Sequence, residues 1–421
     1  MKNIFTSAEL AAIREKFHYV DHDPAGRRRI FFDNAGGSLR LKAAEEAFSR
    51  TDAAPDCSEH SNRVARDLDD LEQRGRRDLL ECVFNAPEGV LYPSYSASQI
   101  IMELCRVFAG NARGNNVVTT ALEHPSSFDG MRLHADAHGR EFRVAPVNPA
   151  TSGVDANSVI DLVDKDTAVL SCMYASNISG FIFDVERIFR AARKANPDIL
   201  ILCDAVQHAP HAALDFPALG ADAIVFAPYK FFGVRGFGVA CLSERAATLP
   251  HHKLIGKPAG EWGLGSPAPG HYAAISAIVD YVSGLGGADG GATRGRETFA
   301  RGMARIAGHE RNLLEQMLDG IGGEPGLRSI PGVTVKMDGS PVAERDFIVG
   351  IEFANLKCED ATAEYERRGI IVFERSATSL YSRRMVEAFG SSGVVRVSPL
   401  HVHGSEDIAA FLRATREIAA I

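Results

Sequence analysis

Several features that would point directly to a function are missing from this sequence. No apolar run reaches 18 residues, so we expect no helix that crosses a membrane. The formal net charge is −8, which gives no support to nucleic-acid binding. The seven cysteines form no CxxC pair and have no metal-ligand spacing, so no metal site is predicted. Scattered cysteines within apolar runs are typical of a reduced, cytoplasmic protein.

The N-terminal segment lacks the continuous apolar stretch of a signal peptide, and it carries charges throughout. We therefore expect a cytoplasmic protein. Thr6 followed by Glu9 fits a capping box and predicts a short helix that docks on the rest of the chain. Residues 1–25 are interpreted as this N-terminal helical segment.

What the sequence does contain is an alternation of apolar strands and helical patterns from about residue 30 to 245. With 421 residues, of which 45% are hydrophobic, the chain can build a large core and a second, smaller unit. The alternation predicts an α/β fold, with a mainly parallel sheet and helices on both faces. The glycine-rich stretch 286–291 predicts a boundary. We expect a large domain over 26–285 and a small α+β domain over 292–421.

The most informative stretch contains an acidic residue and a lysine at the ends of two successive apolar strands. Asp204 ends the first strand, and Lys230 follows the second among Tyr229, Phe231 and Phe232. In a βαβ layout both reach the crevice at the carboxyl ends of the strands. A desolvated lysine is a neutral amine that attacks an aldehyde, and a carboxylate keeps a pyridine nitrogen protonated. This pairing is what a pyridoxal phosphate site needs.

The same stretch leaves a structural alternative open. Lys230 could be a solvated surface lysine and Asp204 a strand-end cap. Gln207 supports the cofactor interpretation, because its amide could bond to the phenolic oxygen of the ring. Asp204-Ala-Val-Gln207, followed by Tyr229-Lys230-Phe-Phe-Gly233, resembles the aminotransferase class V group of fold-type I pyridoxal phosphate enzymes, the cysteine desulfurase-like family.

The resemblance implies a large cofactor-binding domain, a smaller C-terminal domain, a homodimer and a small-molecule amino-acid substrate. Lys230 and His124 are the implied catalytic residues, the histidine stacking on the cofactor ring within a Glu-His motif. Asn177, in a Ser-Asn-x-x-Gly turn, would face the cofactor and substrate. Ser266 stands where the family has a threonine that reaches the neighbouring subunit's phosphate.

Hydroxyl and small residues precede a helical run at Ser96, Ala97 and Ser98. Free amides and the helix dipole make such a turn an anion site, although a plain serine N-cap has the same pattern. In the family this turn holds the cofactor phosphate. Asn34, Ala35 and Gly36 form a small-residue turn after a strand. An ordinary strand-to-helix turn would look the same, but the family uses a similar segment to line the substrate side.

Arg396 lies alone on an apolar strand, where a buried guanidinium needs an anion. An internal carboxylate is one possible partner. The family uses a comparable arginine to hold the amino-acid carboxylate, which makes Arg396 a predicted substrate-binding residue.

The sequence also departs from the family's persulfide-forming members, which carry a nucleophilic cysteine just before the arginine strand. Phe373 to Arg384 contains no cysteine, and Cys358 reads as part of a helix start. Tyr229 and Ala227 stand where these enzymes usually have histidine and a phosphate-binding serine. The segment around Leu380-Tyr381 resembles the lyase and epimerase-like branch.

Two reactions fit these features. One is β-elimination by a C–S lyase, or a desulfurase-like reaction without the persulfide cysteine. The other is that of a class V aminotransferase or an amino-acid epimerase. A non-catalytic binding protein is a third possibility, and the presence of Lys230, Asp204 and Arg396 together argues against it.

Overall fold

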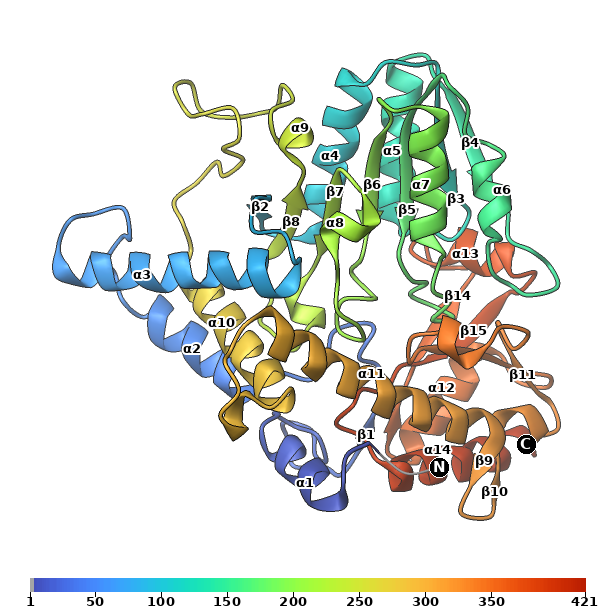
Figure 1. Ribbon diagram of the computed structural model, residues 1–421. Helices are drawn as coiled ribbons and strands as arrows, with labels where there is room; N and C mark the ends of the chain where they lie inside the picture. The colour runs from blue at the N-terminus through green and yellow to red at the C-terminus, as the bar shows by residue number, and fades with distance from the viewer. Residues whose placement is uncertain (1–3) are drawn as a thin grey trace.

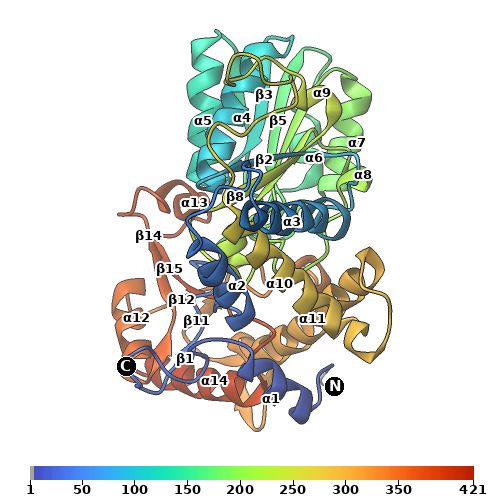
Figure 2. The same ribbon diagram turned by 90° about the vertical axis from the view of Figure 1, so that its left-hand side faces the viewer.

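The chain forms two units, each built on its own sheet, in the computed structural model, which describes residues 4–421 (Figure 1). The upper unit contains a seven-stranded sheet and the lower unit a four-stranded antiparallel sheet. Helix α1 (Ser7–Glu15) and the terminal helix α14 (Ser405–Ala419) both lie in the lower unit (Figure 2). Thr6 and Glu9 form the predicted capping box at the start of α1.

The large sheet has the strand order β2-β8-β7-β6-β5-β3-β4. Neighbouring strands from β7 to β4 are parallel, while β8 runs antiparallel to both β7 and β2. This mixed, mostly parallel sheet confirms the predicted α/β fold. The strands are β2 (Val90–Ser94), β3 (Asn116–Thr120), β4 (Glu141–Ala145), β5 (Thr167–Met173), β6 (Leu200–Asp204), β7 (Ala223–Phe226) and β8 (Gly238–Leu242).

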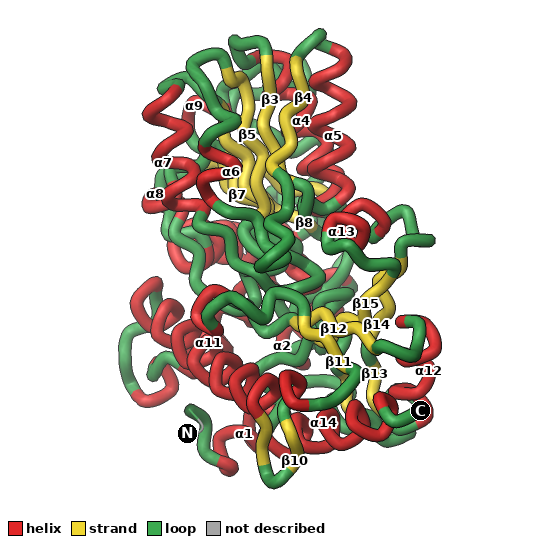
Figure 3. Tube along the Cα trace, turned by 90° about the vertical axis from the view of Figure 1, so that its right-hand side faces the viewer, coloured by secondary structure: helices red, strands yellow, loops and turns green. Residues whose placement is uncertain are grey.

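Both faces of this sheet are buried, because alternate residues of its strands enter different cores. Leu202 belongs to one apolar cluster, and its neighbours Ile201 and Cys203 belong to another. A strand buried on both faces reads as a continuous apolar run, as the sequence does here. Helices α4 (Ala97–Asn111) and α5 (Pro125–Ala137) lie on one side of the sheet (Figure 3). Helices α6 (Ala156–Ile160), α7 (Val185–Ala195) and α8 (Phe216–Leu219) lie on the other.

Four long helices connect the two units: α2 (Lys42–Asp52), α3 (Arg63–Arg77), α10 (Pro269–Leu285) and α11 (Arg296–Asp319). The amphipathic pattern over 64–83 predicts one helix, but the structure continues α3 as a π-helical turn, Asp78–Val83. A short helix, α9 (Glu244–Ala247), precedes the long loop that leads to α10. The glycine-rich stretch 286–291 lies between α10 and α11, and the domain division placed there stays a prediction.

The lower sheet has the order β11-β12-β15-β14 and is antiparallel throughout. Its elements are β11 (Val333–Val335), β12 (Val349–Phe353), β14 (Phe373–Ser376) and β15 (Gly393–Val397), with α12 (Cys358–Arg367) and α13 (Arg383–Ala388). A short hairpin of β9 (Gly320–Ile321) and β10 (Glu324–Pro325) follows α11.

An early segment of the chain completes the lower unit. Strand β1 (Ile30–Phe31) pairs in parallel with β13 (Ile370–Ile371), and Phe32 is buried in the core of the lower unit. The chain then passes directly to the predicted turn at Asn34. Within residues 4–421, no helix is both long and apolar enough to cross a bilayer.

Candidate active site

One pocket gathers the predicted residues at the carboxyl edge of the large sheet, where α/β folds bind ligands. Nine of the residues singled out from the sequence line it: Ser96, Ala97, Ser98, His124, Asn177, Asp204, Gln207, Tyr229 and Lys230. The other lining residues are Ile101, Ser126, Met173, Ala175, Val206 and Ala227. Most of the lining residues lie at or just after the ends of strands β2, β3, β5, β6 and β7. Residues between Ser96 and Lys230 that are far apart in the sequence therefore form one site.

Lys230 ends a 3-10 turn, Pro228–Lys230, directly after β7. Phe231 and Phe232 behind it are buried, and Phe232 has a φ of 62°. A positive φ is unfavourable for a bulky residue, so packing holds this turn in place. The backbone N–H of Phe232 donates to Ser38 Oγ at 3.0 Å. The lysine is therefore fixed at its base, and its amine points into the pocket lining.

Burial and the charge of Arg396 together lower the pKa of Lys230 to about 7, although the charge of Asp204 opposes the shift. An amine with this pKa is largely neutral just above neutral pH and can act as a nucleophile or a base. Its Nζ lies 5.7 Å from the centre of the Tyr229 ring.

Asp204 is a buried carboxylate at the end of β6, 6% exposed. Within residues 4–421 its carboxylate accepts one hydrogen bond, from the backbone N–H of Val206 at 3.0 Å. Burial raises its pKa, and the Val206 hydrogen bond and the charge of Lys230 oppose that shift. A buried carboxylate with so few partners suits a cationic ring nitrogen. Gln207 is held beside it, because its amide donates to the carbonyl of Ala35 at 3.1 Å.

Ser96 is the N-cap of α4, and its Oγ accepts from the backbone N–H of Gln99 at 3.2 Å. The N–H groups of the first turn have no partner within the helix, so they form an anion site together with the helix dipole. Strand β8 approaches this turn closely. A Cβ on Gly238 would lie 2.4 Å from the nitrogen of Ala97, so only glycine fits at that position.

His124 is the N-cap of α5, and its Nδ1 accepts from the backbone N–H of Ser126 at 3.3 Å. Burial, together with the charges of Lys230, Arg375 and Arg384, lowers its pKa to about 3. The ring is therefore neutral, and its proton lies on Nε2 because Nδ1 is the acceptor.

Glu123 fixes the turn that carries His124. Its carboxylate accepts from Thr120 Oγ1 at 2.8 Å and from the backbone N–H of Met173 at 2.9 Å. Burial raises the pKa of Glu123 to about 7.

Arg396 lies beside the pocket on β15 and is 3% exposed. Its Nη2 donates to Asp33 Oδ1 at 2.6 Å, and its Nη1 donates to the carbonyl of Asn177 at 3.3 Å. The internal carboxylate that the sequence left open as a partner is thus Asp33. Arg396 Nε and Asn177 Oδ1 are buried and have no hydrogen-bond partner within the described part of the chain.

The remaining predicted residues lie outside the pocket lining of this chain. Asn34, Ala35 and Gly36 form a turn beside Arg396, and a Cβ on Gly36 would lie 3.2 Å from Arg396 Nη2. Ser266 is exposed on the long loop before α10, away from its own pocket. Its predicted role concerns a second subunit and stays a prediction.

Sequence reasoning did not single out three charged residues near this site, Asp33, Arg375 and Arg384. Asp33 reaches Arg396 only through the β1–β13 pairing and an isolated bridge from Asp33 to Ser398. The two arginines come from a polar stretch that resembles an exposed loop. The concentration of arginines over 375–384 was the feature of the sequence that could have indicated a site there.

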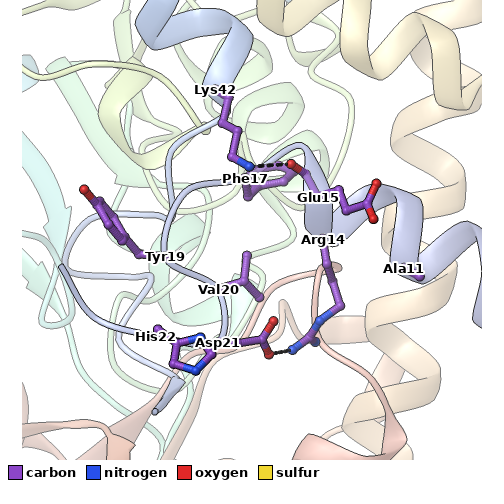
Figure 4. A pocket seen from close by; sticks show the side chains of 9 residues that line it. All are labelled: Ala11, Arg14, Glu15, Phe17, Tyr19, Val20, Asp21, His22 and Lys42. Atoms are coloured by element: carbon purple, nitrogen blue, oxygen red, sulfur yellow. Dashed lines mark hydrogen bonds and ion pairs between the residues drawn. The ribbon is translucent and has the colours of Figure 1, made fainter. Parts of the chain in front are cut away.

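A second hollow, on the N-terminal segment, is lined by polar groups that already pair with one another (Figure 4). Lys42 Nζ donates to the carbonyl of Glu15 at 2.8 Å, and Arg14 forms an ion pair with Asp21. None of the residues predicted for the cofactor or the substrate lines this hollow. In residues 4–421, no cluster of histidine, cysteine, aspartate or glutamate could hold a metal ion.

Comparisons with known proteins bear on the family and the fold. The aminotransferase class V family profile matches residues 30–411. The chain is 25% identical over 359 residues to a probable cysteine desulfurase of Mycobacterium leprae, covering 80% of this chain and 82% of that protein. It is 22% identical over 423 residues to a probable cysteine desulfurase of Synechocystis, covering 96% and 94%.

Solved structures share the fold. A cysteine desulfurase from Thermococcus onnurineus superposes with a TM-score of 0.79 at 19% identity, covering 97% of this chain and 98% of that one. A cysteine desulfurase from Escherichia coli gives a TM-score of 0.77 at 18% identity, covering 99% of both chains. At these identities the likeness concerns the fold.

The fold and the family profile together define the class of protein, a pyridoxal phosphate-dependent enzyme. The chain belongs to the aminotransferase class V family. Its residues fit the cofactor that this family implies. They supply a half-buried lysine with a lowered pKa, a buried carboxylate with one hydrogen bond, and the open N-terminus of α4.

Proposed function

We propose that this enzyme acts on an α-amino acid as a C–S β-elimination lyase. The observation that carries the proposal is the convergence of Lys230, Asp204 and His124 in one pocket beside Arg396. Bound pyridoxal phosphate supplies an electron sink for bonds that break at the substrate's α-carbon. Lys230 would hold the cofactor, the Asp204 carboxylate would keep its ring nitrogen protonated, and the N-terminus of α4 would bind its phosphate.

The other residues position and deprotonate the substrate. Arg396 binds the α-carboxylate, for which its forked guanidinium is suited. Lys230 takes the α-proton, because its lowered pKa makes it a base near neutral pH. Loss of that proton and of the sulfur substituent, followed by addition of water, yields a thiol, pyruvate and ammonia. The atoms balance without an oxidant or a reductant.

A persulfide route is not favoured by the positions of the cysteines. None of the residues that line the pocket, all within 4–421, is a cysteine. Cys358 begins α12, packs in the core of the lower unit, and is 8% exposed. This arrangement supports a reaction that proceeds without a cysteine nucleophile.

We further propose a homodimer in which Ser266 contacts the phosphate site of the second subunit. The loop that carries Ser266 also exposes Leu254, Ile255 and Leu264, which is the kind of apolar surface that a subunit contact covers.

The test is a panel of L-amino acids and S-substituted cysteines, scored for cofactor absorbance and product. Pyruvate release without a keto-acid co-substrate supports the lyase. Amino transfer to a keto acid would instead indicate an aminotransferase, and loss of optical activity an epimerase. No absorbance change with any amino acid would refute the proposed function.

A further inference from the structure

A second arginine shares the sheet face that carries Arg396. Strand β14 pairs with β15 so that Phe373 lies opposite Arg396 and Arg375 opposite Val394. Since alternate residues of a strand face the same side, Phe373, Arg375 and Arg396 lie on one face. The Cζ atoms of Arg396 and Arg375 lie 5.3 Å and 5.9 Å from the centre of the Phe373 ring. The two guanidinium groups are therefore neighbours.

Within the described residues, Arg375 has no carboxylate partner. It is 8% exposed, and its Nη2 donates to the carbonyl of Tyr381 at 3.0 Å. Its Nε is buried without a hydrogen-bond partner within residues 4–421, and no ion pair of Arg375 occurs in that range. The nearby Asp33 is already bonded to Arg396. A buried guanidinium without an anion is costly, so an anion is missing at this position.

Arg375 is not among the residues that line the pocket, but its charge reaches the reactive groups. Its charge is among the causes that lower the pKa of Lys230 and of His124. Arg384 adds a further positive charge beside His124, since its guanidinium donates to the carbonyls of Ala121 and Glu123. The region next to His124 is thus positive.

A substrate with a single carboxylate leaves this charge unmatched. Its α-carboxylate would meet Arg396, while Asp33 balances one of the two neighbouring arginines. Asp204 would be occupied by the ring nitrogen of the cofactor. One further anion near Arg375 would balance these two neighbouring arginines, and the substrate side chain is the group that can carry it.

We propose that Arg375 binds an acidic group on the substrate's side chain, so that the enzyme selects an amino acid whose side chain ends in an oxyanion. For a C–S lyase this means an S-substituted cysteine with an acidic substituent. The inference rests on the proposed function, because it requires Arg396 to take the α-carboxylate. Arg375 is a specificity residue in this account, and Lys230 remains the base.

Two isosteric substrate pairs test the charge of the side chain without changing its size. One pair is S-carboxymethyl-L-cysteine and S-carbamoylmethyl-L-cysteine, and the shorter pair is L-aspartate and L-asparagine. Dissociation constants are measured from the cofactor absorbance of the holoenzyme. In the pair whose length fits the site, we expect the acid to bind about ten- to hundredfold more tightly than the amide.

Variants assign that preference to Arg375. The Arg375→Gln variant should bind acid and amide equally. The Arg375→Lys variant should keep part of the preference for the acid, and this partial rescue would show that the fold is intact. Arg383→Gln is the matched control, because Arg383 is an exposed arginine of the same segment that donates to the carbonyl of Ala377. It should behave as the wild type does.

The outcomes separate this inference from the proposed function. Equal binding of acid and amide in both pairs by the wild type, or a preference that survives in Arg375→Gln, overturns the role of Arg375. If amino-acid binding still depends on Arg396 in that case, the proposed function stands. If no amino acid perturbs the cofactor, the proposed function fails, and this inference fails with it.

Discussion

Arg396 and Asp33 form a buried ion pair, with Nη2 of the arginine 2.6 Å from Oδ1 of the aspartate. They come from opposite ends of the chain, and the pairing of β1 with β13 brings them together. Asp33 fixes the guanidinium at the edge of the pocket and at the same time places a negative charge where a substrate carboxylate would arrive. The pair therefore sets both the position of Arg396 and its affinity for an anion.

Asp33→Asn tests whether the charge of Asp33 lowers the affinity of Arg396 for an anion. The asparagine keeps the size of the side chain and an oxygen acceptor but removes the charge. We expect amino acids to bind more tightly, because repulsion of their carboxylate is lost. A titration of cofactor absorbance measures this. An unchanged or weaker affinity in a variant with normal cofactor content would show that Asp33 acts only by positioning Arg396.

The lowered pKa of Lys230 predicts how cofactor capture by the apoprotein depends on pH. Only the neutral amine attacks the aldehyde, so the rate of capture should rise as the pH increases through about 7. An ordinary lysine would reach this point only near pH 10.4. Stopped-flow absorbance gives the rate. Lys230→Met should show no covalent capture after borohydride reduction, and trapping at a different lysine would contradict the assignment.

The same pKa has a consequence for stability. Folding lowers the pKa of Lys230 from its ordinary value, so the apoprotein loses stability as the pH falls from about 10.4 towards 7. Lys230→Met carries no such charge. We expect this variant to unfold at a higher temperature than the wild-type apoprotein at pH 6, with a difference that shrinks as the pH is raised to 9. A difference that does not depend on pH would indicate a packing effect.

Cys358 should be dispensable for turnover. Its thiol is buried at the start of α12 and donates to Glu359 Oε2 at 3.2 Å, and burial raises its pKa to about 12. A protonated, buried thiol is a poor nucleophile. Cys358→Ser is expected to keep wild-type kcat/KM. Loss of activity in a folded variant with full cofactor content would revive a persulfide mechanism.

The residues at strand ends could be predicted from the sequence for a simple reason. Parallel strands bring their carboxyl ends to one edge, so Asp204 after β6 and Lys230 after β7 had to be close once the strands were recognised. The turns after β3 and β5 carry His124 and Asn177 to the same edge. Local patterns and one topological rule were sufficient for Asp204 and Lys230, whereas His124 and Asn177 were named from the family resemblance.

Three other residues could not be placed in this way. Arg375 belongs to a polar stretch, and its burial follows from the register of β14 against β15. Asp33 reaches Arg396 through contacts between the two ends of the chain. Ser266 lies on an exposed loop whose predicted role depends on a second subunit. These relationships depend on tertiary packing, which the local sequence does not encode.

The most direct test of the central claim compares an α-amino acid with its decarboxylated amine. If Arg396 holds the α-carboxylate, the wild type should turn over the amino acid and use the amine poorly. Arg396→Lys should lose about ten- to hundredfold in kcat/KM while its cofactor absorbance stays unchanged, since a charged hydrogen bond contributes about 1.5–3 kcal/mol. Equal kcat/KM for the amino acid and the amine in the wild type would contradict the claim that this enzyme acts on α-amino acids.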